Sequence, residues 1–154
     1  MSTPLLHLTI RYEQDVVAAR QRARQIAGLL GFDTQDQTKI ATAVSEIARN
    51  AFGYAGGGRV EFAMEGRSSP QLFTVRVSDA GPGIPDLERI LEGRYRSPTG
   101  MGVGILGAKR LMDSFEIVST PGGTTVTLRK LLPPRTALIG PDRVRQISGA
   151  LAAQ

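Results

Sequence analysis

Glu46 and Asn50 are two polar residues whose types and spacing could support proton transfer and metal binding. They lie within residues 34–52, where apolar side chains recur at helical spacing. On a helix, residues four positions apart point about 40° from each other and lie one turn apart. Here they fall on the flank of the apolar stripe. A carboxylate there can accept a proton from a hydroxyl group, and an amide oxygen can ligate Mg²⁺. The alternative is a pair of solvated residues on the rim of a helix.

Asp79 is a carboxylate at the predicted end of a strand. Residues 72–78 alternate between apolar and polar side chains, and Gly81 and Gly83 follow Asp79 closely. Glycine lets a ligand approach the backbone. A partly buried carboxylate at this point could accept a hydrogen bond from an amino group such as that of adenine. An ordinary strand-to-loop turn, rich in Asp, Gly and Pro, would also explain the segment.

Three alternating glycines, Gly100, Gly102 and Gly104, precede a helical pattern and enclose Met101 and Val103. Backbone N–H groups at the start of a helix attract anions, and the helix dipole favours phosphate there. We therefore predict that this segment contacts the phosphates of a nucleotide. The alternative is a flexible hinge.

Two other nucleotide-binding motifs do not fit these glycines. Residues 102–107 match the dinucleotide G-x-G-x-x-G string, but no strand precedes them and no β-α-β unit follows. A Walker phosphate loop needs Gly-Lys-Ser/Thr, whereas Ala108 and Lys109 follow Gly107. The three groups of residues together indicate an ATP site of another kind.

The elements that must position these groups follow from the periodicity of the sequence. Thr124 opens the last predicted strand, where its hydroxyl could contact adenine directly or through water. The order of elements favours a two-layer α+β sandwich, with helices on one face of a mixed, mostly antiparallel sheet. The predicted strands are residues 6–10, 59–64, 72–78, 115–120 and 124–130, and the predicted helices are residues 14–30, 34–52, 86–91 and 103–113.

Composition and length indicate one globular domain with an extension. The chain has 154 residues, of which 41% are hydrophobic and 21% charged, as is ordinary for a globular protein. Pro133 and Pro134 mark a boundary between a domain of residues 1–132 and an extension of residues 133–154 that could hold a short helix. The absence of Cys excludes disulfides and favours a cytoplasmic location. A single His excludes a zinc cluster and a Ser-His-Asp triad.

The net charge of +5 favours an anionic partner. We do not expect nucleic acid, because no helix-turn-helix pattern and no interleaving of basic and aromatic residues accompanies the charge. An acidic protein or the phosphates of ATP fit better. No apolar run approaches the roughly 20 residues of a membrane span, so no membrane partner is expected.

Taken in order, the motifs resemble those of the GHKL ATPase and kinase superfamily. The superfamily motifs correspond here to Glu46-x-x-x-Asn50 for the N box, Asp79-x-Gly81-x-Gly83 for the first glycine box, Gly100-x-Gly102-x-Gly104 for the second and Gly123-Thr124 for the terminal pair. The resemblance covers residues 5–130 and implies the Bergerat ATP-binding fold. Residues 42–58 and 107–113 are most similar to the small anti-sigma-factor-type serine/threonine kinases, especially the RsbT-type switch kinases.

The resemblance implies a role for each motif. Asp79 would bind the adenine amino group, Asn50 would hold Mg²⁺, and Glu46 would be the catalytic base. Residues 84–99 would form a lid over ATP. Kinases of this type phosphorylate Ser or Thr on a STAS-domain antagonist in stress or sigma-factor pathways. A downstream phosphatase or a sigma-pathway regulator would be a further partner.

The sequence also allows an ATP- or ADP-gated binding module that sequesters or activates a partner without catalysis. It would use the same site, so Glu46 alone favours the kinase. Residues 52–58 lack the His that is common in direct sigma-factor binders, which favours a switch kinase over an anti-sigma factor. A sensor histidine kinase would need an acceptor His, and His7 lies in a strand pattern. The sequence also allows a homodimer.

Overall fold

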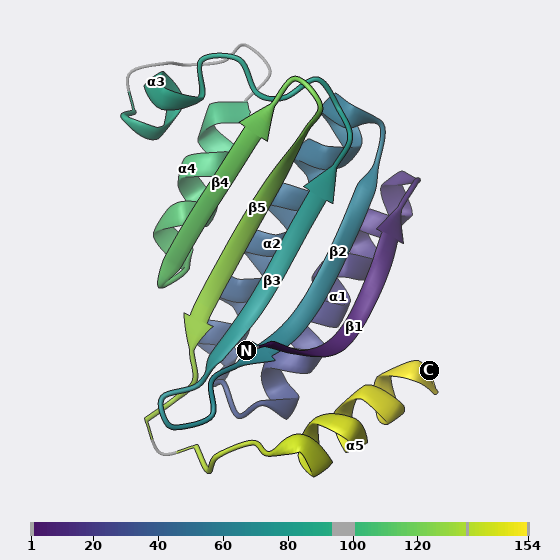
Figure 1. Ribbon diagram of the computed structural model, residues 1–154, viewed down its shortest axis with the longest axis vertical. Coiled ribbons are helices and arrows are strands. Elements are labelled where there is room, and N and C mark those ends of the chain that lie inside the picture. The colour runs from purple at the N-terminus through teal and green to yellow at the C-terminus, as the bar shows by residue number, and fades with distance from the viewer. Residues whose placement is uncertain (1, 94–100, 135, 154) are drawn as a thin grey trace.

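In the computed structural model, a five-stranded sheet has a layer of helices on one face (Figure 1). The structure describes residues 2–93, 101–134 and 136–153, and only the backbone of residues 101–103. Helices α1 (Glu13–Leu29), α2 (Thr34–Ala55) and α4 (Met101–Leu111) form one layer, and the sheet forms the other, as predicted. The elements, in chain order, are β1 (Ser2–Ile10), α1 (Glu13–Leu29), α2 (Thr34–Ala55), β2 (Gly58–Glu65), β3 (Leu72–Asp79), α3 (Leu87–Leu91), α4 (Met101–Leu111), β4 (Ser114–Thr120), β5 (Gly123–Leu131) and α5 (Pro141–Ala152).

The strand order is β1-β2-β3-β5-β4, and all four pairings are antiparallel. The two-layer α+β sandwich is therefore confirmed, although its sheet is antiparallel rather than mixed. The cause is the position of β5. The crossover through α4 brings β4 back in the same direction as β3, but β5 lies between these two strands and pairs with both. As a result, the start of β5 lies beside the end of β3.

Helix α2 is longer than its sequence pattern predicts, and the extra turn reaches the functional site. It begins after Asp33, whose side chain accepts a hydrogen bond from the backbone N–H of Asp36 at 2.8 Å. We expected the helix to end near Phe52. It instead continues through Gly53 and stops at Gly56, which has the left-handed φ of 77° typical of a helix C-cap. A glycine inside a helix weakens it by about 1 kcal/mol but does not end it.

The main core lies between the sheet and the helix layer. Phe62 and Phe73 stack on neighbouring strands with ring centroids 6.2 Å apart, and both side chains are fully buried. Ile40 and Val44 of α2 are buried in the same cluster. This packing fixes the face of α2 that turns toward the sheet, and so places Glu46 and Asn50 on its flank.

Helix α5 packs against β1 and joins the main core. Its Val144, Ile147 and Leu151 are buried. The segment before α5 is held by the side-chain amide of the buried Gln71. Its Nε2 donates a hydrogen bond to Ile139 O at 3.0 Å, and its Oε1 accepts one from Ile139 N at 2.8 Å. None of the described helices is long and apolar enough to cross a membrane.

Candidate nucleotide-binding site

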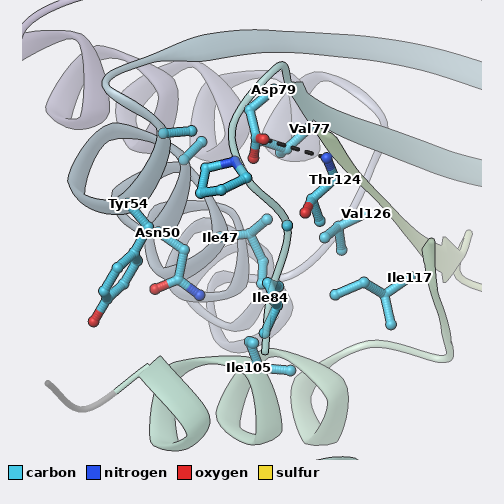
Figure 2. Close-up of a pocket in the computed structure, with 14 residues that line it drawn as sticks. Ile47, Asn50, Tyr54, Val77, Asp79, Ile84, Ile105, Ile117, Thr124 and Val126 are labelled. Atoms are coloured by element: carbon cyan, nitrogen blue, oxygen red, sulfur yellow. Dashed lines mark hydrogen bonds between the residues drawn. The ribbon is translucent and has the colours of Figure 1, made fainter. Parts of the chain in front are cut away.

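Asp79 lies where β3 ends, and one of its two carboxylate oxygens is already used by the fold. Oδ1 accepts hydrogen bonds from the backbone N–H of Gly81 at 3.0 Å and from that of Thr124 at 3.2 Å. The second of these bonds joins the ends of β3 and β5 and is drawn in Figure 2. No hydrogen bond to Oδ2 is present among the described residues. This half-buried oxygen is an unused acceptor.

The loop after Asp79 needs glycine at two points where the backbone approaches other elements. A Cβ atom at Gly81 would collide with the side chain of Ala55 at the end of α2. Gly83 has a φ of 87°, and a Cβ atom there would collide with the carbonyl of Thr120 on β4. These glycines therefore let the loop close between α2 and the β4–β5 hairpin.

Glu46 and Asn50 lie beside the first turn of α4. A Cβ atom placed on Gly104 would be 2.9 Å from Glu46 Oε2 and 3.9 Å from Asn50 Oδ1. The other carboxylate oxygen, Glu46 Oε1, accepts a hydrogen bond from Arg49 Nη1 at 3.4 Å, and 36% of the Glu46 side-chain surface is exposed. Both side chains therefore lie next to the first turn of α4.

A cavity joins Asp79, Asn50 and the loop (Figure 2). Ile84 lies across its middle, and Ile105 of α4 closes one end. Of the residues predicted to bind a nucleotide, Asn50, Asp79, Gly83 and Thr124 line it. Gly81 donates its backbone N–H to Asp79 and does not line the cavity, and neither does Glu46. The other lining residues are Ile47, Ala51, Tyr54, Ala55, Val77, Pro82, Ile117 and Val126.

The second glycine group is only partly described. Gly100 lies outside the described residues, as do residues 94–99 of the predicted lid. Helix α4 begins at Met101, so the backbone of Met101, Gly102, Val103 and Gly104 forms its first turn. We expected the helix to begin near Val103. An earlier start keeps the N–H groups of these residues at a helix N-terminus, where an anion is favoured.

The residues present fit a purine nucleotide and Mg²⁺. Apolar side chains such as Ile47 and Ile117 suit the faces of a flat base, and Asp79 Oδ2 suits an amino group. Among the described residues, no group of three or more His, Cys, Asp or Glu side chains could hold a metal. Asn50 would therefore supply one oxygen ligand, with phosphate and water oxygens completing the shell, which is a usual arrangement for Mg²⁺.

Sequence reasoning missed two kinds of residue. The apolar lining residues Ile47 and Ile105 belong to helical stripes that predict core, and a stripe does not show which of its members border a cavity. The other is Ser119, whose hydroxyl accepts from Ile84 N at 2.7 Å and lies 2.9 Å from Thr124 Oγ1. The available signal was its two-residue spacing from Phe115 and Ile117 along β4, which places Ser119 on the same face as these two residues, toward the helices.

Comparison with known proteins agrees with this geometry. Residues 9–130 match the family model of the histidine kinase-like ATPase domain. The chain is 42% identical over 124 residues to the serine/threonine-protein kinase RsbT of Bacillus subtilis (strain 168), which covers 80% of this chain and 93% of that protein. It is 33% identical over 114 residues to the anti-sigma F factor of Bacillus licheniformis, which covers 68% of this chain and 77% of that protein.

Two solved structures share the fold. One contains the RsbU and RsbW domains of a Mycobacterium tuberculosis protein, with a TM-score of 0.60, 24% identity, and coverage of 88% of this chain and 35% of that one. The other is the SiaB–SiaC complex from Pseudomonas aeruginosa, with a TM-score of 0.53, 12% identity, and coverage of 83% and 90%. At these identities the likeness concerns the fold alone. The family model spans most of the chain and includes every predicted site residue, so this protein belongs to the histidine kinase-like ATPase domain family of the GHKL superfamily, as a relative of the RsbT serine/threonine kinase.

Proposed function

We propose that this protein is a Mg-ATP-dependent serine/threonine protein kinase that phosphorylates a STAS-domain antagonist in a partner-switching pathway of the cytoplasm. One observation carries the proposal: Asp79 and Asn50 line one cavity, and Glu46 and Asn50 both lie beside Gly104 in the first turn of α4. The 42% identity to a serine/threonine-protein kinase supports the reaction class. The partner class rests on the resemblance to switch kinases.

Each of the three side chains would do one part of the work. Asp79 Oδ2 would accept a hydrogen bond from the adenine amino group, and Asn50 Oδ1 would hold the metal. Bound Mg-ATP would supply the γ-phosphoryl group. Glu46 would accept the proton of the Ser or Thr hydroxyl that receives this group. Its partly exposed carboxylate suits a hydroxyl group that arrives on another protein.

The test combines the purified chain with STAS-domain proteins encoded by neighbouring genes, Mg²⁺ and radiolabelled ATP. We expect the wild-type chain to label a Ser or Thr of one STAS protein. Glu46→Gln should lower the rate of transfer about 10²- to 10⁴-fold, since general-base catalysis contributes that much. It should leave ATP affinity nearly unchanged, because Glu46 does not line the cavity. The matched control is Glu61→Gln, which makes the same change in β2 on the sheet face away from the cleft.

Two results would count against the kinase. If the wild-type chain binds ATP but labels no STAS protein, and Glu46→Gln changes nothing, the proposal is wrong. If partner binding depends on the nucleotide and survives Glu46→Gln, while neither form transfers phosphate, the protein is instead an ATP- or ADP-gated binding module.

A further inference from the structure

Ser119 on β4 connects two walls of the nucleotide cavity without lining it. The backbone N–H of Ile84 donates to Ser119 Oγ at 2.7 Å, and this oxygen lies 2.9 Å from Thr124 Oγ1. Ile84 and Thr124 both line the cavity, at the loop after β3 and at the start of β5. Ser119 therefore holds the loop after β3 against the β4–β5 hairpin, and it lies within hydrogen-bond distance of the hydroxyl of Thr124, which lines the cavity.

The hydrogen-bond partners of Ser119 restrict where its proton can go. A hydroxyl group has one proton and two lone pairs. The Ile84 N–H occupies one lone pair of Ser119. If Ser119 donates its proton to Thr124, the hydrogen bonds run from Ile84 N–H through Ser119 to Thr124, and the proton of Thr124 is available to a group in the cavity. In the reverse arrangement Ser119 accepts twice, and its own proton has no acceptor among the described hydrogen bonds.

The Thr124 hydroxyl and the unused oxygen of Asp79 belong to two residues that line the same cavity. Thr124 is 6% exposed, and its backbone N–H is already bonded to Asp79 Oδ1 at 3.2 Å. In this arrangement the cavity wall presents an acceptor, Asp79 Oδ2, and a donor, the Thr124 hydroxyl. A 6-aminopurine offers the complementary pair, an amino donor beside a ring-nitrogen acceptor. A 6-oxopurine in the same orientation offers a carbonyl acceptor beside an N–H donor, which is the reverse.

We propose that Ser119 is a positioning residue that orients the Thr124 hydroxyl as a donor into the cavity, and that it thereby favours 6-aminopurine over 6-oxopurine nucleotides. The inference rests on the nucleotide site of the proposed function and adds a residue that sets its base specificity. Ser119 acts through Thr124 and through the loop at Ile84.

Nucleotide binding by the full chain tests this role. Isothermal titration with Mg-ATP and with Mg-ITP gives the ratio of the two affinities. For Ser119→Ala we expect a three- to tenfold weaker affinity for ATP, about the value of one lost hydrogen bond, and a smaller loss for ITP. The ATP:ITP ratio should therefore fall. Ser119→Thr keeps the hydroxyl and should keep the ratio. Ser114→Ala removes a hydroxyl from the opposite face of the same strand and should change neither affinity.

An unchanged ATP:ITP ratio in Ser119→Ala would overturn the inference, even if both affinities fell, because an equal loss would mean that Ser119 only supports the loop. If Ser119→Ala does not fold, Ser119→Cys, a weak donor of similar size, gives the same comparison. A wild-type chain that binds neither nucleotide would overturn the proposed site together with this inference. A wild-type chain that binds ATP, with an unaltered ratio in the variants, would overturn this inference alone.

Discussion

Asp79 and Glu46 each divide their two carboxylate oxygens between the fold and the candidate site. Asp79 uses Oδ1 for the backbone N–H groups of Gly81 and Thr124 and leaves Oδ2 unused among the described residues. Glu46 Oε1 accepts a hydrogen bond from Arg49, while Glu46 Oε2 lies toward Gly104. A substitution can therefore remove one function of a side chain and keep the other, and this separates effects on binding from effects on folding.

Asp79→Asn uses this division. The amide keeps one oxygen for the N–H groups of Gly81 and Thr124, but an NH₂ group replaces the unused oxygen and faces the amino group of adenine. Two donors then oppose each other, and we expect about a 10- to 100-fold loss of ATP affinity, with a small change in Tm. Isothermal titration and thermal unfolding measure the two quantities. Asp142→Asn, at an exposed position in α5, is the control that should bind normally. Normal ATP binding by Asp79→Asn would contradict the assigned role.

At the scale of elements, the site depends on how helices begin, end and touch. The last turn of α2 carries Tyr54 and Ala55 to the cavity because Gly56, and not Gly53, ends the helix. Helix α3 follows the first glycine group, and its Ile90 packs with Ile105 of α4 in a small separate cluster. This contact holds α3 against α4. Helix α1 contributes indirectly, because it packs along α2 and supports the helix that carries Glu46 and Asn50.

The N-terminus of α1 should make stability depend on pH. The Asp15 carboxylate accepts from the backbone N–H of Arg11 at 2.8 Å and of Tyr12 at 2.9 Å, and these bonds, with that to Arg11 the larger cause, lower its pKa below the ordinary 3.8. A lowered folded-state pKa means that this stabilisation is complete above the unfolded-state pKa and is lost as the pH falls through the lower, folded value.

We therefore expect Asp15→Asn to lower Tm at pH 7, and the difference from wild type to shrink below about pH 4. Thermal unfolding followed by circular dichroism from pH 7 to pH 3 measures it. Glu13→Gln removes a charge from the same turn and shows how much of the effect comes from the helix dipole alone. A Tm difference that stays constant down to pH 3 would show that the ionised Asp15 carboxylate is not responsible.

At the scale of the whole molecule, α5 packs into the same hydrophobic core as the elements that carry the candidate site. Its buried side chains join the same core cluster as the sheet and helices α1 and α2, and the Gln71 amide fastens the segment before it. Residues 131–154 lie beyond the region matched by the family model. The division into residues 1–132 and 133–154 is thus a prediction that unfolding measurements can test.

Ile147→Ala should destabilise the entire chain. The side chain is 1% exposed, and truncation of a buried Ile typically costs about 2–5 kcal/mol of unfolding free energy. If α5 and the ATP-binding region unfold together, urea unfolding followed by circular dichroism and by loss of ATP binding will give one shared transition with a lower midpoint. Gln146→Ala, exposed on the same helix, should change the free energy by less than about 0.5 kcal/mol. Loss of helix signal before any loss of ATP binding would show that residues 133–154 unfold separately.

The local pattern of side chains was enough to predict most elements and the motif residues. Alternation along residues 72–78 and helical spacing along residues 34–52 depend only on which side chains must face a core, and this information lies within one short segment. The positions of Glu46, Asn50 and Asp79 within those segments followed in the same way. Element ends such as that of α2 differed by a few residues, because capping geometry decides them.

Only the tertiary structure decided how the segments meet. Thr124 N reaches Asp79 Oδ1 across 45 positions of the chain, and Ile84 N reaches Ser119 Oγ across 35. Both contacts exist because β5 lies between β3 and β4, a strand order set by the packing of the whole sheet against its helices. The same packing placed the buried side chains of Ile47 and Ile105 at the wall of a cavity. Periodicity reports which face of an element is apolar, whereas the partner of that face depends on contacts between segments distant in sequence.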